Sequence, residues 1–235
     1  MRKTQFSEGQ FYHIYNRGTE KRKIFLDDSD YQRFYLSMRL MNDEQSDLMS
    51  QWKDFKTANP YAELNSFPRL SLGKEKPLVE FVCYSLLPNH YHFILTQLAE
   101  KGIEKFMHRL GVGYSMYFNK KYDRNGALFQ GTFKASKIKP DSLLYLSAYV
   151  NCNAEVYGFA RAEIYRWSSF LEYIEEKKDL CAGGKKIILD DFKGGDDYKE
   201  FAEENIKHFK EKKIDEKMML DDFQDLVLEK AGTYS

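Results

Sequence analysis

The chain has 235 residues, of which 43% are hydrophobic and 31% charged, with 18 Phe and 17 Tyr. This length and composition allow an enzyme-sized core and exclude a disordered chain. No stretch approaches the roughly eighteen apolar residues of a membrane-spanning helix, and the N-terminus lacks a signal-peptide core. We therefore expect a cytoplasmic protein with no membrane partner. The three cysteines are widely separated, which indicates neither a disulfide framework nor a thiolate metal site.

The formal net charge of zero hides an uneven distribution of charge along the chain. Residues 101–139 carry nine basic and two acidic side chains, whereas residues 171–235 carry 18 acidic and 12 basic ones. The first segment could attract a polyanion, whereas the second would not and could compete with one. A solvated helix surface explains the same charges about as well.

The first half of the chain predicts a strand, a helix and then a hairpin. Residues 10–16 alternate and are rich in β-formers, and the acidic cluster at residues 27–30 can cap a helix whose apolar positions follow with helical spacing. Residues 42–77 lack a clear period, which indicates an irregular or partly helical insertion. Residues 78–87 and 90–96 read as two strands joined at Pro88-Asn89. His13, alone on the first strand, is interpreted as structural.

The second half predicts a helix at 102–121, an extended basic and aromatic segment at 128–138, and another helix from 141 to about 153. The resulting order of elements is typical of a split β-α-β arrangement. We predict the α+β class, with a ferredoxin-like antiparallel sheet and helices packed on it. Residues 1–175 would form this domain, and residues 176–235 a charged C-terminal appendage with helices at 198–212 and 221–230.

Two histidines begin the second strand of the predicted hairpin. Because successive side chains of a strand point to opposite faces, His90 and His92 project from the same face about 7 Å apart. Two imidazoles on one face can hold one metal ion, although a chance pair with a structural role is the commoner case.

Tyrosine and asparagine residues recur at intervals of four in the helix that starts near residue 141. Tyr145, Tyr149 and Asn153 therefore lie on one helix face and place a hydroxyl one turn from an amide oxygen. Helical spacing by itself favours a core role for such tyrosines, because most helical tyrosines among leucines are packing residues.

Several ordered motifs together resemble the single-tyrosine HUH transposases, most closely the REP-associated tyrosine transposases. They span roughly residues 8 to 175 and comprise residues 12–18 (YHIYNRG), 87–95 (LPNHYHFIL), 126–134 (GALFQGTFK), 149–153 (YVNCN) and 167–170 (WSSF). The resemblance implies that His90 and His92 bind the metal and that Tyr149 is the nucleophile. Asn153 is similar to the polar residue that completes the metal site in this family. Two positions depart from the family pattern: Tyr91 between the histidines, and Ala154 where a proline is usual.

The resemblance implies an enzyme that cleaves single-stranded DNA, often beside a hairpin, and transfers the strand through a covalent 5′-phosphotyrosine link. Such chemistry serves DNA transposition or the mobilisation of REP elements. Imidazole and amide ligands with phosphate oxygens suit Mg²⁺ or Mn²⁺. For DNA contacts the candidates are basic residues between the two motifs: Lys120, Lys121, Arg124, Lys134 and Lys137.

Two other functions remain compatible with the sequence. A noncatalytic single-stranded nucleic-acid binder could use exposed aromatic residues as stacking platforms on the same sheet. A plain metal-dependent phosphodiesterase would cleave without Tyr149. The sequence also leaves open the proton acceptor and the choice between a monomer and a homodimer, in which tyrosine and histidines could come from different chains.

Overall fold

The computed structural model describes residues 4–175 and 180–212. Its strands are β1 (Phe11–Arg17), β2 (Val79–Leu87), β3 (His90–Gln97) and β4 (Lys134–Lys137). The α-helices are α1 (Asp28–Leu40), α2 (Leu48–Ala58), α3 (Pro68–Ser71), α4 (Gly102–Lys121), α5 (Leu143–Val156), α6 (Phe170–Ile174), α7 (Lys186–Leu189) and α8 (Gly195–Lys212). Short 3-10 turns are η1 (Thr19–Lys21), η2 (Leu64–Ser66), η3 (Pro140–Ser142) and η4 (Ala162–Ile164). The helix predicted at 221–230 lies outside the described residues.

The four strands form one antiparallel sheet in the order β2-β3-β1-β4. Strand β3 pairs with β2 through the hairpin turn at Pro88-Asn89 and with β1 on its other side, so β1 and β3 are the central strands. The predicted α+β class and split β-α-β sheet are therefore confirmed. The capping prediction also holds: the Asp27 carboxylate accepts a hydrogen bond from the Asp30 amide at 3.0 Å and begins α1.

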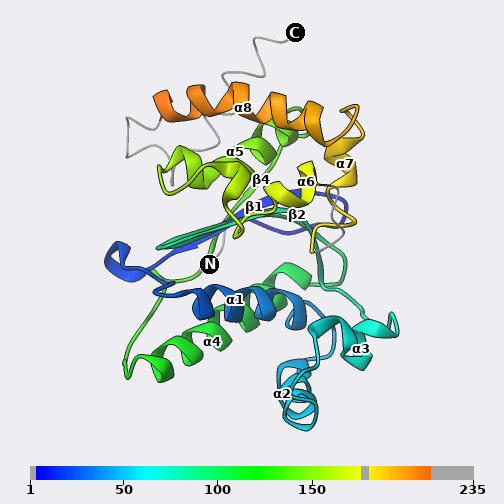
Figure 1. Ribbon diagram of the computed structural model, residues 1–235, viewed down its shortest axis with the longest axis vertical. Helices are drawn as coiled ribbons and strands as arrows, with labels where there is room; N and C mark the ends of the chain where they lie inside the picture. Colours follow the sequence, from blue (N-terminus) through cyan, green and yellow to red (C-terminus); the bar gives the residue numbers. More distant parts are fainter. Residues whose placement is uncertain (1–3, 176–179, 213–235) are drawn as a thin grey trace.

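Helices cover both faces of the sheet (Figure 1). On one face, α1 and α4 bury Phe34, Met38, Phe106 and Leu110 against Tyr12 and Phe93 of the sheet. On the other face, α5 and α8 bury a second cluster that includes Leu146, Val150 and Phe209 against Val82 and Ile94. Alternation along the strands supplies both clusters, because neighbouring residues face opposite sides of the sheet.

Residues 42–77 are partly helical, as expected, and hold α2, η2 and α3. They carry a small separate apolar cluster in which Leu48 and Phe67 are buried with Leu40 of α1. In Figure 1 these helices project from the lower edge of the molecule, below the helix layer formed by α1 and α4.

The helical C-terminal appendage is present as α7 and α8, and α8 lies across α5 (Figure 1). Tyr198, Ala202 and Phe209 of α8 are fully buried against α5 and extend the second cluster. None of the helices in the described part combines the length and apolarity that crossing a bilayer requires.

Candidate active site

His90 and His92 lie at the start of β3 and face α5, while Tyr91 between them faces α1 and α4. The ring centroids of the two histidines are 5.1 Å apart, and both side chains are buried, with exposed fractions of 5% and 0%. Tyr91 packs instead with Phe34 and Phe129 in the first apolar cluster. The expectation that Tyr91 points away from the histidine pair is confirmed.

The proton on the His90 ring is placed by its neighbour in the hairpin turn. Asn89 donates its amide Nδ2 to the Lys21 carbonyl at 3.2 Å, which leaves its Oδ1 facing His90 Nδ1 at 2.6 Å. A carbonyl oxygen can only accept, so in this contact His90 Nδ1 is the donor. When the ring is neutral, its Nε2 then carries a lone pair.

His92 contacts a histidine that the sequence had suggested was structural. His13 Nε2 lies 2.8 Å from His92 Nδ1, and both rings are buried. Burial lowers the pKa of His13 to about 3 and lowers that of His92 well below its usual value, so both are neutral at physiological pH. His92 Nε2 is buried and has no hydrogen-bond partner among the described residues.

Tyr149 comes from α5 and lies beside the histidines within the same chain. Its ring centroid is 6.1 Å from that of His92 in an edge-to-face arrangement. The side chain is fully buried, and burial raises the pKa of its phenol well above the usual value, with further contributions from Tyr157 and Tyr145. The buried phenol is therefore protonated at neutral pH.

Asn153 lies one helical turn after Tyr149 and is fully buried. Neither Oδ1 nor Nδ2 of its amide has a hydrogen-bond partner in the described part of the chain. A buried polar group without a partner is costly, and such groups often mark a position where an ion or ligand binds. The described residues contain no group of three or more His, Cys, Asp or Glu side chains placed for a metal ion.

Two aromatic residues that the sequence analysis did not single out complete the surroundings. Tyr157 follows the end of α5, lies 4.9 Å from His90 between ring centroids, and hydrogen-bonds Tyr149. Phe209 of α8 lies 5.3 Å from the Tyr149 ring and covers it. Neither has a local sequence signal, because both reach the site through the packing of α8 and the end of α5.

The five predicted DNA-binding residues do not form one patch. Lys134 pairs with Tyr15 across β1 and β4 and lies on the face of the histidines, with Nζ 6.0 Å from the Tyr15 ring centroid. Lys137 pairs with Tyr12 and therefore lies on the opposite face. Lys120 lies in the last turn of α4 and Arg124 follows the end of this helix, which packs on the sheet face opposite the histidines.

Lys121, also at the end of α4, is occupied by acidic partners. Its Nζ lies 2.7 Å from carboxylate oxygens of both Asp27 and Asp30. Asp30 is fully buried, so this contact compensates a charge at the start of α1.

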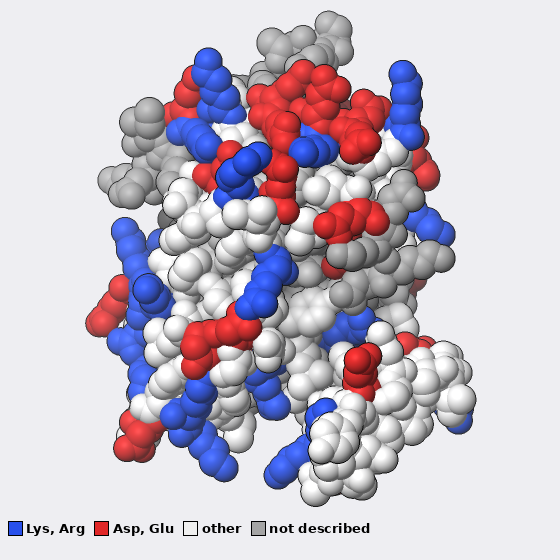
Figure 2. Space-filling view, in the orientation of Figure 1, with Lys and Arg blue, Asp and Glu red and all other residues white. Residues whose placement is uncertain are grey.

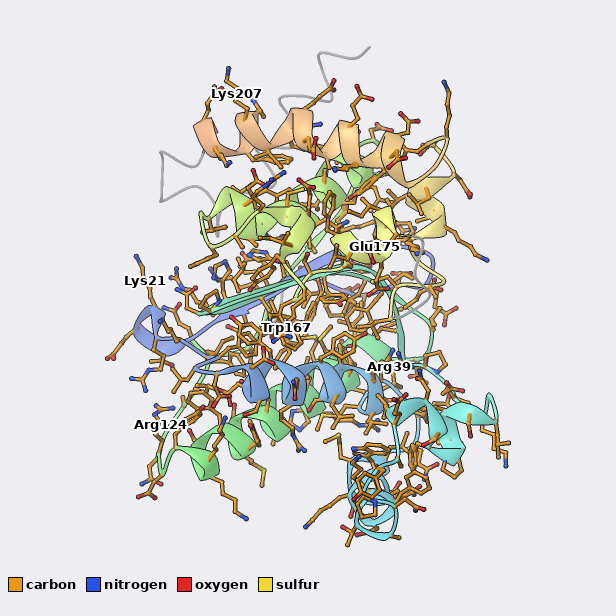
Figure 3. The ribbon with its side chains drawn as sticks, in the orientation of Figure 1. Lys21, Arg39, Arg124, Trp167, Glu175 and Lys207 are labelled. Atoms are coloured by element: carbon orange, nitrogen blue, oxygen red, sulfur yellow. The ribbon has the colours of Figure 1, made fainter. Side chains whose placement is uncertain are left out.

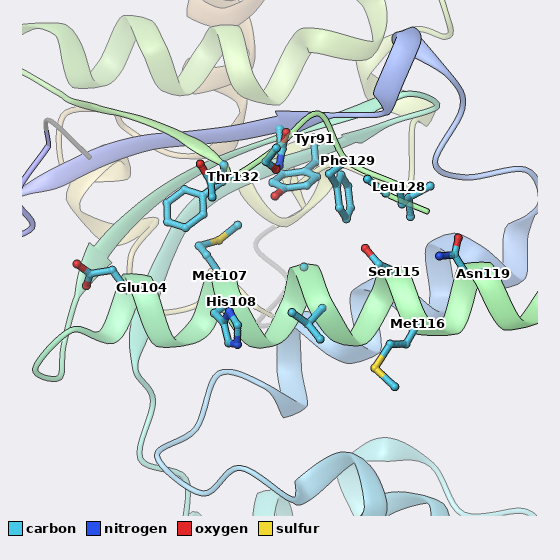
Figure 4. A pocket seen from close by; sticks show the side chains of 16 residues that line it. Tyr91, Glu104, Met107, His108, Ser115, Met116, Asn119, Leu128, Phe129 and Thr132 are labelled. Carbon is cyan, nitrogen blue, oxygen red and sulfur yellow. The ribbon is translucent and has the colours of Figure 1, made fainter. Parts of the chain in front are cut away.

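A groove of about 610 Å³ opens on the other side of the sheet (Figure 4). It runs between α4 and residues 127–133, with Met107, Val112 and Phe129 among its apolar walls and Tyr91 at its floor. Because Tyr91 and His92 face opposite sides of β3, the sheet separates this groove from Tyr149.

The α+β fold thus brings His90, His92, Tyr149 and Asn153 together in one buried candidate site. Residues 72–153, about a third of the chain, match the model of the family described as "Transposase IS200 like". This match contains His90, His92, Tyr149 and Asn153, and it confirms the relationship to transposases that the motifs predicted.

Two solved structures are similar to the chain. One is a REP-associated tyrosine transposase bound to a REP hairpin, with 12% identity, coverage of 77% of this chain and 92% of the other, and a TM-score of 0.47. The other is a protein from Deinococcus radiodurans R1 assigned as a transposase, with 13% identity, coverage of 64% and 95%, and a TM-score of 0.34. No curated protein matches the chain.

Proposed function

We propose that this protein cleaves single-stranded DNA and transfers the strand through a covalent 5′-phosphotyrosine intermediate formed by Tyr149, with a divalent cation held at His90, His92 and Asn153. The single observation that carries the proposal is the meeting of a tyrosine with a histidine pair and a partnerless amide in one buried site. The family match over the same residues supports this reading of the site.

The side chains fit a hard divalent cation. His90 and His92 each have Nδ1 engaged by a neighbour, which would leave Nε2 of each ring to hold the ion, as is usual for metal-binding histidines. Asn153 Oδ1 would add an oxygen ligand, and phosphate oxygens of the DNA would supply others. Such a mixed set suits Mg²⁺ or Mn²⁺ better than a closed zinc site. The bound cation would polarise the scissile phosphate and offset its developing charge.

Tyr149 provides the nucleophile in this reaction. Its phenol oxygen forms a bond to phosphorus while the bond from phosphorus to the 3′ oxygen breaks, so one phosphoester replaces another. The phenol gives up one proton and the leaving 3′ oxygen takes one up, which balances the step. The hydrogen bond with Tyr157 holds the phenol in place, and the Tyr149 ring packs edge-to-face on the His92 ring with 6.1 Å between centroids.

The DNA partner is proposed from the family and the surface. Lys134 lies on the face of the site and is the first candidate for a phosphate contact, and Lys120, Arg124 and Lys137 would act at a greater distance. A single-stranded segment beside a hairpin is the expected substrate. The His92–Tyr149 contact forms within one chain, which supports a site assembled from a single chain.

The decisive experiment is covalent capture of DNA. A single-stranded oligonucleotide with a flanking hairpin, labelled at its 3′ end, is incubated with the protein and Mn²⁺ or Mg²⁺ and resolved under denaturing conditions. We expect a labelled protein band that disappears in EDTA and in Tyr149→Phe. Tyr145→Phe, one turn earlier on the same helix, is the matched control and should keep the band.

The other outcomes of this capture experiment separate the rival functions. Binding of the oligonucleotide with no covalent band under any metal condition would indicate a noncatalytic nucleic-acid binder. Cleavage that survives Tyr149→Phe would indicate a metal-dependent phosphodiesterase. A band lost in Tyr145→Phe and kept in Tyr149→Phe would move the nucleophile by one turn.

A further inference from the structure

We infer that His13 is a positioning residue for His92 and that it sets the affinity of the proposed site for its cation. This inference rests on the proposed function. His13 would touch neither the cation nor the DNA, and would act by fixing which nitrogen of His92 carries the proton.

The contact between the two rings follows from the register of the central strands. Tyr15 of β1 is directly opposite His92, and His13 is opposite Ile94, so His13 and His92 are diagonal neighbours on the same face. Their rings are nearly parallel, with an interplanar angle of 6°, and the Nε2 to Nδ1 distance is 2.8 Å. Tyr15 lies against both rings, with centroid distances of 5.0 and 5.7 Å, and limits their movement.

The proposed cation decides the direction of this hydrogen bond, because donation by either ring puts the remaining proton on a buried nitrogen, Nε2 of His92 or Nδ1 of His13. If His13 donated, a neutral His92 would carry its proton on Nε2, which is buried and has no hydrogen-bond partner among the described residues. An N–H in that position would be unsatisfied and could not bind a cation. If His92 Nδ1 donates to His13, Nε2 instead has a lone pair directed at the site.

His90 reaches the same state by an independent route, because Asn89 Oδ1 can only accept from its Nδ1. Two acceptors from different parts of the chain, one in the hairpin turn and one on β1, thus hold both histidines in the form that binds a metal. Interactions of this kind typically change metal affinity by about 10- to 100-fold when removed.

The test measures Mn²⁺ binding directly, by electron paramagnetic resonance of the free ion in titrations of the metal-free protein. His13→Phe keeps a ring but removes the acceptor, and should weaken Mn²⁺ binding about 10- to 100-fold. His13→Gln places an amide oxygen near the former Nε2 position and should bind Mn²⁺ close to wild type. His108→Gln, at an exposed position of α4, is the control for loss of an imidazole.

The possible results are distinguishable from failure of the proposed function. Wild-type protein that binds no Mn²⁺ would overturn both. Wild-type binding that is unchanged in a correctly folded His13→Phe, as judged by circular dichroism, would overturn only the role of His13. Equal loss in His13→Gln and His13→Phe would also overturn it, since packing rather than an acceptor would then be responsible.

A second inference comes from the loop after β1. We propose that residues 17–23 contact the phosphate backbone of the DNA beside the cleavage site, which also rests on the proposed function. The segment holds four cationic residues and one acidic one, in the order Arg17, Glu20, Lys21, Arg22 and Lys23. Figure 2 shows Lys and Arg side chains gathered along this edge, and Figure 3 shows Lys21 extending from it.

The conformation of this loop is unusual and is held in place by the histidine hairpin. Glu20 and Lys21 have left-handed backbone angles, with φ of 57° and 58°, which non-glycine residues rarely adopt. Gly18 donates its amide to the Asn89 carbonyl at 2.8 Å, and the Lys21 carbonyl accepts from Asn89. Strained backbone of this kind is typical of binding sites. Here it places exposed cations next to the residue that orients His90.

The experiment compares the salt dependence of binding to a labelled single-stranded oligonucleotide. The double variant Lys21→Gln/Lys23→Gln should lower the slope of log Kd against log salt by about 1.4, for two lost phosphate contacts. Lys53→Gln/Lys74→Gln, in the insertion, removes the same charge elsewhere and should leave the slope unchanged. Equal slopes for wild type and the loop variant would overturn the proposal. Absence of salt-dependent binding by wild type would overturn the proposed DNA substrate as well.

Discussion

Replacing Asn153 by Leu should make the metal-free protein more stable while weakening the site. Leu has the same branching at Cγ and removes two buried polar atoms that have no partner among the described residues. An unsatisfied buried group costs about 1–3 kcal/mol, so a gain of about 2 kcal/mol is expected after some loss to the larger volume of Leu. For a chain of this size that gain raises the melting temperature by about 4–8 °C.

The assay is thermal unfolding of both proteins in EDTA and in Mn²⁺. Saturating Mn²⁺ at about 100 times Kd stabilises wild type by about 2.7 kcal/mol, and every tenfold loss of affinity in Asn153→Leu removes about 1.4 kcal/mol of that effect. A gain in stability in EDTA that shrinks or reverses in Mn²⁺ is the signature of a ligand position.

Asn151→Leu is the matched control on the same helix. Its amide is equally buried but hydrogen-bonds Tyr198 at 2.8 Å and Ser169 at 2.6 Å. Its replacement should cost about 2–3 kcal/mol in either condition, because two buried partners lose their bonds. If Asn153→Leu destabilised the metal-free protein as Asn151→Leu does, the reasoning about Asn153 would be refuted.

Three further predictions concern access, pH and surface charge. Phe209→Ala should lower the free energy of unfolding by about 3 kcal/mol and so lower the melting temperature. At temperatures where the fold is intact it should nevertheless speed covalent capture of DNA, and an unchanged or slower rate would contradict this. Because burial lowers the pKa of His13 to about 3 and that of His92 well below its usual value, the unfolded chain binds protons that the folded chain does not once the pH falls below about 6.5. Stability is therefore complete above that pH and should fall by up to about 1.4 kcal/mol per pH unit for each histidine, and urea unfolding between pH 6.5 and 5 should show a shallower slope in His13→Phe. Lys121→Ala should cost about 1 kcal/mol of stability because it removes the cation that pairs with the buried Asp30 carboxylate. It should leave the salt dependence of DNA binding unchanged, which fluorescence anisotropy can verify.

The sheet and the helices on it could be predicted because each depends on a local period in the sequence. Alternation in 90–96 placed His90 and His92 on one face, and helical spacing placed Asn153 one turn from Tyr149. The family resemblance supplied what periodicity lacks, namely that these two faces meet across the space between β3 and α5.

The site residues that the sequence analysis missed depend on contacts between segments far apart in the chain. His13 is 79 positions from His92, and only the pairing of β1 with β3 brings them together. A lone histidine carries no local mark of that partner. Lys121 was predicted as a DNA contact because its positive charge is visible in the sequence. Its pairing with Asp27 and Asp30 depends on how α4 crosses the start of α1, which the sequence does not reveal.

The burial of Tyr149 links the C-terminal helix to the proposed reaction. A fully buried phenol under Phe209 cannot meet a phosphate until the side chains above it move. The two ends of α8 differ in how firmly they are held. Near its start, the Tyr198 hydroxyl bonds Asn151 at 2.8 Å and Ser147 at 3.2 Å. Near its end, Phe209 contacts Tyr149 through ring packing, and Lys210 forms a partly exposed ion pair with Glu155 at 3.2 Å, which stabilises little. Since dispersion contacts are lost gradually and buried hydrogen bonds are costly to break, we expect DNA to enter by displacing the Phe209 end of α8 while the Tyr198 end stays docked.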